Sequence, residues 1–96
     1  MMNSLWETFS AREMFSELGY AFINHEEDGY LDYVITCYNN ENDEYYIQDI
    51  IFYLKERTVG AFTNDEDYEA EINEHERYAI NKQIDELGWE TWQELI

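Results

Sequence analysis

The chain is poor in residues that interrupt or cross-link a fold. Its 96 residues include no proline, four glycines and one cysteine. This scarcity leaves no place for long flexible linkers or low-complexity segments, so we expect regular secondary structure over most of the chain. The single thiol, Cys37, has no partner for an internal disulfide, which is typical of a reducing compartment.

Long apolar runs are also missing. No stretch approaches the roughly 20 apolar residues of a membrane-spanning helix, and the first residues lack the basic region and apolar run of a signal peptide. We therefore expect a cytoplasmic protein with no membrane partner.

Basic residues are the scarcest charged class. Five cations face 23 carboxylates, which gives a formal net charge of −18. The cations are scattered along the chain at Arg12, Lys55, Arg57, Arg77 and Lys82. Such a set cannot neutralise a run of phosphates, which excludes nucleic acid as a direct partner, and anionic membranes would repel the chain. The expected attraction is toward basic protein surfaces.

Aromatic residues, in contrast, are plentiful. The chain has nine Tyr, five Phe and three Trp, and 45% of its residues are hydrophobic. Disordered acidic chains are poor in aromatics, so this composition predicts a folded domain with one modest core. We place that domain at residues 10–89, between an N-terminal extension (1–9) and a C-terminal tail (90–96). In the extension, Leu5, Trp6 and Phe9 predict a separate helical turn or an apolar arm.

Two helices are predicted by capping boxes. The first box spans residues 10–13 and begins a helix over about Ala11–Leu18; the second spans 73–76 and begins a helix over about Glu74–Leu87. Each helix is followed by a glycine that is typical of a Schellman ending.

In such an ending, the residue after the glycine packs back on the helix. This rule predicts contacts of Tyr20 with Phe15 and of Trp89 with Ile84.

Four strands are predicted between the helices. Alternating or apolar runs rich in Tyr, Ile and Val, separated by turn signals such as Asp28-Gly29, favour strands; the runs are Tyr20–Asn24, Tyr30–Tyr38, Tyr45–Leu54 and Thr58–Phe62. The order predicts an α+β fold with a short N-terminal helix, a four-stranded antiparallel sheet and a C-terminal helix packed on one face of the sheet. In the second strand, Leu31 and Tyr33 alternate with Asp32, as in a half-buried strand.

No catalytic or metal-binding pattern is present. Residues 64–69 are acidic, but Glu69 occupies the place of the glycine that an EF-hand loop requires. His75-Glu76 begins like a zinc-binding helix, yet Ala79 stands where the second histidine belongs. Cys37 lies on an apolar strand face, as buried inert thiols do. We therefore expect no enzyme activity, no metal and no cofactor; a calcium-dependent domain is a third interpretation, which heating with and without calcium tests.

Two segments carry a resemblance. The first segment consists of residues 11–15 and Leu18-Gly19-Tyr20, and the second of residues 79–89 (Ala-Ile-Asn-Lys-Gln-Ile-Asp-Glu-Leu-Gly-Trp). In these two segments, the chain resembles a family of small uncharacterised proteins encoded by phages and mobile elements of low-GC Gram-positive bacteria. In size and charge it also looks like the small acidic phage inhibitors of host nucleases, the anti-CRISPR and anti-restriction proteins. The resemblance implies a role against host defence and brings no catalytic site.

The charge is compatible with nucleic-acid mimicry. A folded chain of this length has a diameter of about 32 Å, and duplex DNA of that length carries about 19 phosphates. We therefore predict a non-enzymatic inhibitor whose partner is a basic, nucleic-acid-binding host nuclease. The candidate contact residues are the acidic residues of one long segment and of two strand turns, with one tyrosine among them: Asp65, Glu66, Asp67, Tyr68, Glu69, Glu71 and Glu74, then Glu26, Glu27 and Asp28, and Glu41, Asp43 and Glu44.

Three points stay open. One interpretation is that the acidity serves only solubility, although −18 exceeds the magnitude of about 2–8 that small domains need. An acidic interaction module that binds another basic protein without mimicking DNA is the alternative function. Tyr68 either anchors the partner contact or pins its own loop.

Overall fold

The computed structural model describes residues 8–94. The predicted roles of Leu5 and Trp6 lie outside the described residues, whereas Phe9 packs against the core. Along the chain the elements are α2 (Ala11–Glu17), β1 (Ala21–His25), a short turn of 3-10 helix (Glu26–Asp28), β2 (Tyr30–Asn39), β3 (Glu44–Tyr53), β4 (Thr58–Thr63), α3 (Glu74–Leu87) and β5 (Gln93–Glu94).

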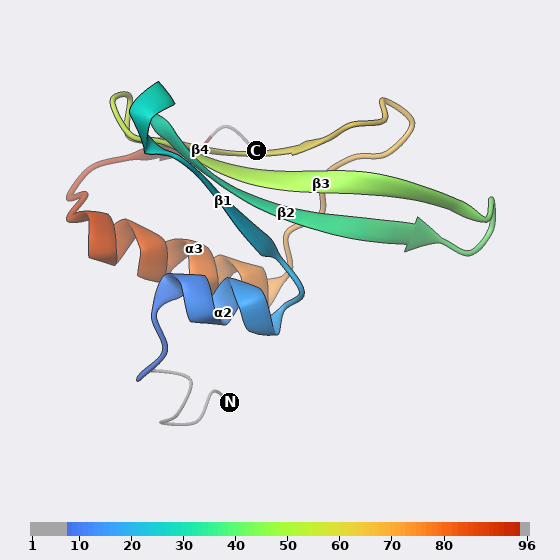
Figure 1. The fold of residues 1–96 in the computed structure, drawn as a ribbon, viewed down its shortest axis with the longest axis horizontal. Coiled ribbons are helices and arrows are strands. Elements are labelled where there is room, and N and C mark those ends of the chain that lie inside the picture. Colours follow the sequence, from blue (N-terminus) through green and yellow to red (C-terminus); the bar gives the residue numbers. More distant parts are fainter. Residues whose placement is uncertain (1–7, 95–96) are drawn as a thin grey trace.

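The elements form two layers, with α2 and α3 side by side against one face of the sheet (Figure 1). The strand order is β1-β2-β3-β4-β5, and β1 to β4 are antiparallel neighbours. The predicted α+β class is therefore confirmed. None of the helices within residues 8–94 has the length and apolar character needed to cross a membrane.

The prediction of four antiparallel strands is wrong in one respect. A fifth strand, β5, pairs in parallel with β4, so the sheet is mixed. The chain returns from α3 along the edge of β4, where the Gln93 amide donates to the Arg57 carbonyl oxygen at 3.0 Å. A strand of two residues carries no alternation of apolar and polar residues, so the sequence pattern could not reveal it.

Both helices begin as their capping boxes predict. The Ser10 Oγ accepts from the Glu13 amide at 3.1 Å, and the Glu13 Oε1 accepts from the Ser10 amide at 2.9 Å. The Asn73 and Glu76 pair makes the same two bonds, each at 2.9 Å. The amides at the helix starts are thereby satisfied, which stabilises the first turns of α2 and α3.

Both helices also end in Schellman motifs. The Tyr20 amide donates to the Phe15 carbonyl at 2.9 Å, and their rings meet edge to face at 5.4 Å. The Trp89 amide donates to the Ile84 carbonyl at 3.2 Å. Gly19 and Gly88, with φ of 99° and 72°, supply the left-handed conformation that the motif requires.

The core fills the space between the helices and the sheet. Phe15 from α2 stacks on Tyr33 from β2 at a ring distance of 3.9 Å. Ile50 and Phe52 of β3 are fully buried beside them, with Ile80 of α3. The Tyr33 hydroxyl donates to the Gln83 Oε1 at 2.5 Å, so the polar groups of this core are paired.

The opposite side of β1 to β4, which we call the open face, is covered by no helix of residues 8–94 (Figure 1). Side chains alternate between the two faces, and the strand registers assign the positions. The large and charged residues of the open face are Ile23, His25, Tyr30, Asp32, Val34, Tyr38, Tyr45, Ile47, Asp49, Ile51, Tyr53 and Phe62.

Candidate functional site

Seven of the predicted carboxylates lie at one end of the sheet. They come from the β2–β3 turn and from the loop that follows β4. The two segments meet because the Asn64 amide donates to the Ile47 carbonyl at 3.0 Å and the Asn64 Oδ1 accepts from the Ile47 amide at 2.8 Å. We call this group the acidic end; its members are Glu41, Asp43, Glu44, Asp65, Glu66, Asp67 and Glu69.

Tyr68 joins the two segments of the acidic end. Its ring stacks on Tyr46 at 4.2 Å with an angle of 3° between the planes. Its hydroxyl donates to the Glu44 Oε2 at 3.0 Å and accepts from the Asn42 Nδ2 at 3.2 Å. Of the two interpretations that the sequence left open, these contacts favour the one in which Tyr68 holds its own loop in place.

Hydrogen bonds also fix the backbone that carries the carboxylates. In the loop, the Asp67 amide donates to the Asp65 Oδ1 at 2.9 Å. The Thr63 Oγ1 contacts two carbonyl oxygens, those of Asp65 at 2.8 Å and Tyr68 at 2.7 Å. The carboxylates of Glu66, Asp67 and Glu69 are therefore exposed on a backbone that is held in place.

The β2–β3 turn is held in the same way. The Asn39 Oδ1 accepts from the amides of Glu41 at 2.9 Å and Asn42 at 3.2 Å. The Tyr38 hydroxyl donates to the Asp43 carboxylate, and this bond raises the pKa of Tyr38. The turn thus presents its carboxylates in a defined arrangement.

No basic residue lies within the acidic end. Residues 38–54 and 58–76 contain neither lysine nor arginine. Lys55 and Arg57 lie in the β3–β4 turn, which is at the other end of β3. Within residues 8–94, no carboxylate of the acidic end forms an ion pair. The potentials of unneutralised like charges add, so an approaching cation meets a strong local negative potential.

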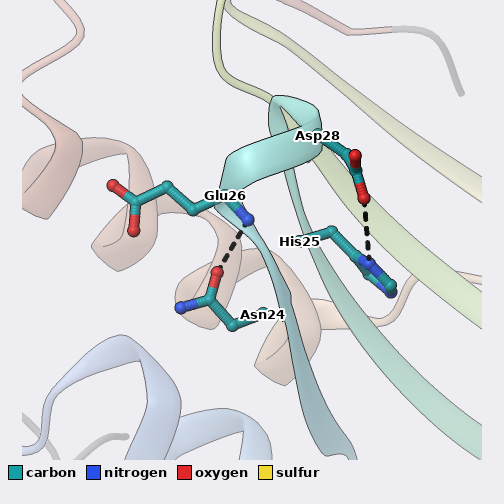
Figure 2. Close-up of polar contacts among 4 residues, drawn as sticks. All are labelled: Asn24, His25, Glu26 and Asp28. Carbon is teal, nitrogen blue, oxygen red and sulfur yellow. Dashed lines mark hydrogen bonds and ion pairs between the residues drawn. The ribbon is translucent and has the colours of Figure 1, made fainter.

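The structure does not bring all the predicted residues together. Glu26, Glu27 and Asp28 form the β1–β2 turn, at the far end of β2 from the acidic end. Ten residues of strand separate the two turns by about 30 Å. Figure 2 shows this turn: the Asn24 Oδ1 accepts from the Glu26 amide at 2.7 Å, and the His25 Nδ1 lies 3.8 Å from the Asp28 Oδ2.

Glu71 and Glu74 lie between the loop and α3. The Glu71 backbone is fixed, because its amide donates to the Gln48 Oε1 at 3.0 Å and its carbonyl accepts from the Gln48 Nε2 at 3.1 Å. Glu74 is the first residue of α3. Both side chains are exposed, so they extend the acidic end toward the helical layer.

A neighbouring buried carboxylate is structural. Glu76 accepts from the Tyr20 hydroxyl and from the Asn73 amide, and the Gln48 Nε2 donates to the Tyr20 hydroxyl at 2.9 Å. Burial, together with this contact with Glu76, raises the pKa of Tyr20. Because both oxygens of Glu76 accept hydrogen bonds from within the chain, the network stabilises the fold.

Cys37 lies in β2 and is partly buried. Burial raises the pKa of Cys37, which disfavours the reactive thiolate. In the part of the chain that the structure describes, no three His, Cys, Asp or Glu side chains are placed to hold a metal ion.

Sequence reasoning missed one pair of carboxylates, Asp32 and Asp49, on the open face. Asp32 alternates with apolar neighbours as predicted, but it is only 8% exposed. Burial, and then the hydrogen bond and charge of Asp49, raise the pKa of Asp32 to about 7. The available signal was an aspartate inside each of two strands, a position where aspartate is disfavoured.

No protein-family model matches the chain, and no curated protein or solved structure matches it either.

Proposed function

We propose that this protein is a phage-encoded, non-enzymatic inhibitor whose acidic end occupies the nucleic-acid-binding surface of a basic host defence nuclease. The observation that carries the proposal is the acidic end itself, where seven carboxylates stand on hydrogen-bonded loops without a basic residue among them. Carboxylates bind guanidinium groups in bidentate fashion, and arginines are the residues that read phosphates and base edges.

We confine the proposed contact to one end of the molecule. The protein measures 40 × 33 × 20 Å, and its two acidic turns lie at opposite ends of β2. Because the acids do not form one continuous ridge, we assign the contact to the acidic end with Glu71 and Glu74, and not to Glu26, Glu27 and Asp28. Such an end could enter a basic groove as a short length of DNA does.

Two variants with equal loss of charge test this assignment. The first neutralises the acidic end through Asp65→Asn, Glu66→Gln, Asp67→Asn and Glu69→Gln; the asparagine at position 65 keeps the Oδ1 that accepts from residue 67. The matched control neutralises four carboxylates at the other end through Glu26→Gln, Glu27→Gln, Asp28→Asn and Glu56→Gln.

The experiment captures proteins from a host lysate on the immobilised chain at low salt and elutes them with duplex DNA. The eluted nuclease is then purified and assayed for DNA cleavage with each variant. We expect the acidic-end variant to inhibit about thirty- to a thousandfold less well, from four exposed ion pairs of about 0.5–1 kcal/mol each, and the control to inhibit like the parent.

Two outcomes contradict the proposal. Equal inhibition by the acidic-end variant and the parent removes the acidic end as the contact. A captured partner that duplex DNA does not displace supports the alternative, an acidic module that binds a basic protein without mimicking DNA.

A further inference from the structure

The open face carries most of the exposed large apolar side chains of residues 8–94. Within residues 8–94, seven large apolar side chains are exposed, and five of them lie on this face, from 37% exposed for Ile47 to 72% for Tyr45. The five are Ile23, Tyr38, Tyr45, Ile47 and Phe62. Folded monomers rarely expose a contiguous apolar patch of more than a few hundred Å², and larger patches mark interaction sites.

Two carboxylates stand in the middle of this apolar surface. Across the strands, Asp32 of β2 lies between Ile23 of β1 and Ile51 of β3. In the neighbouring row of cross-strand pairs, Asp49 of β3 lies opposite Phe62 of β4. Asp32 is more than nine-tenths buried although no helix covers it, and its Oδ1 has no hydrogen-bond partner. An unpaired buried carboxylate oxygen is costly, so it indicates a partner that the chain itself does not supply.

The missing partner is a cation that donates hydrogen bonds. The two carboxyl groups can share one proton between them, but their remaining oxygens can only accept hydrogen bonds, and neither Asp32 nor Asp49 pairs with a basic side chain of residues 8–94. The raised pKa of Asp32 agrees with this arrangement, because burial and the nearby Asp49 both disfavour its charged form. A positive group placed between the two carboxylates would remove both effects.

A guanidinium fits the surroundings better than an ammonium or a metal ion. It is planar, weakly hydrated and able to stack on aromatic rings, and two aromatic residues, Phe62 opposite Asp49 and Tyr53 of the same strand, line the hollow beside Asp49. The Phe62 ring lies along the sheet, since a Cβ on Gly60 would be only 2.5 Å from it. A shallow hollow of about 330 Å³ beside this ring is lined by Asp49, Ile51, Tyr53 and Phe62.

We propose that the open face docks a partner protein through an apolar patch that carries one arginine, whose guanidinium enters between Asp32 and Asp49. A second copy of this chain is a poor occupant, because two such faces would bring two aspartate pairs together between molecules that each carry −18. This surface is separate from the acidic end, so the proposal for the open face does not depend on the proposed inhibition.

The test selects short peptides from a displayed random library against the immobilised protein and measures their Kd by fluorescence polarisation. We expect the selected peptides to share one arginine flanked by apolar residues. Replacing that arginine with citrulline, its neutral isostere, should weaken binding about ten- to a hundredfold, as should Asp49→Asn in the protein. Asp32→Asn with Asp49→Asn should abolish binding.

One control separates this surface from simple attraction to a negative protein. The acidic-end variant (Asp65→Asn, Glu66→Gln, Asp67→Asn, Glu69→Gln) should bind the peptide like the parent. Peptides without arginine, or a loss of binding in the acidic-end variant but not in Asp49→Asn, would overturn the proposal. Self-association in sedimentation that Tyr45→Ser and Ile47→Ser abolish would overturn it in favour of a second copy.

Discussion

Glu76 and Asp32 are both buried carboxylates, yet their surroundings differ. Glu76, between α3 and the sheet, accepts hydrogen bonds from Tyr20 and Asn73. Asp32, on the open face, has one oxygen without a partner. The buried carboxylate of the helix-covered face is therefore fully paired, whereas that of the open face keeps one unpaired oxygen. The same strands supply a structural layer on one side and, on the other, the surface that we propose for binding.

The largest expected effect is a difference in stability between variants that truncate an isoleucine on each face of the sheet. Ile50 and Ile47 belong to the same strand, but Ile50 is fully buried and Ile47 is 37% exposed. Ile50→Ala should lower the free energy of unfolding by about 2–5 kcal/mol and Ile47→Ala by less than about 1 kcal/mol, measured by urea denaturation. Equal losses would mean that the open face is packed as tightly as the covered one.

The second expected effect is a change of stability with pH that Asp32 causes. The pKa of Asp32 rises from 3.8 to about 7 on folding, so between these values the folded state holds a proton that the unfolded state has lost. Its contribution to stability is present near pH 4 and is lost as the pH rises through 7. Asp32→Asn cannot ionise, so its stability relative to the parent should increase between about pH 4 and 8 by as much as about 4 kcal/mol.

Urea denaturation at several pH values measures this difference. Glu76→Gln is the comparison variant, and it should be less stable than the parent at neutral pH because it disturbs the bond from Tyr20. A pH-independent difference between Asp32→Asn and the parent would contradict the burial of a titrating carboxylate on the open face.

A smaller effect is the loss of stability when a tyrosine hydroxyl is removed from each face of the sheet. Tyr33 on the covered face donates to Gln83, whereas Tyr53 lies on the open face. Tyr33→Phe leaves the buried Gln83 oxygen unpaired and should cost about 1–2 kcal/mol, while Tyr53→Phe should cost less than about 0.5 kcal/mol. Thermal unfolding of both variants sharpens the comparison, and a larger loss for Tyr53→Phe would reverse it.

The helices were predictable because their signals are local. A capping box and a terminal glycine act within a few residues, so the start of α3 at Glu74 and its Schellman end at Trp89 follow from the sequence. Strand alternation likewise identified β2 and β3. The parallel strand β5 was not predictable, since its partner is 35 residues away and its length is two residues.

The binding surfaces depended on tertiary contacts. The sequence named the acidic residues but could not show that Glu26–Asp28 and the acidic end are separated by the length of β2. It placed Asp32 in a half-buried strand but could not show that Ile23 and Ile51, from two other strands, flank and bury it. Burial of that kind is decided by register across strands, which a single sequence does not reveal.

The central claim is that the acidic end is the surface that meets the nuclease. Carbodiimide labelling of carboxylates, read by mass spectrometry on the free chain and on the chain bound to the captured nuclease, tests it directly. We expect Asp65, Glu66, Asp67 and Glu69 to be protected in the complex and Glu26, Glu27 and Asp28 to label as in the free protein. Protection of the β1–β2 turn with full labelling of the acidic end would contradict the account.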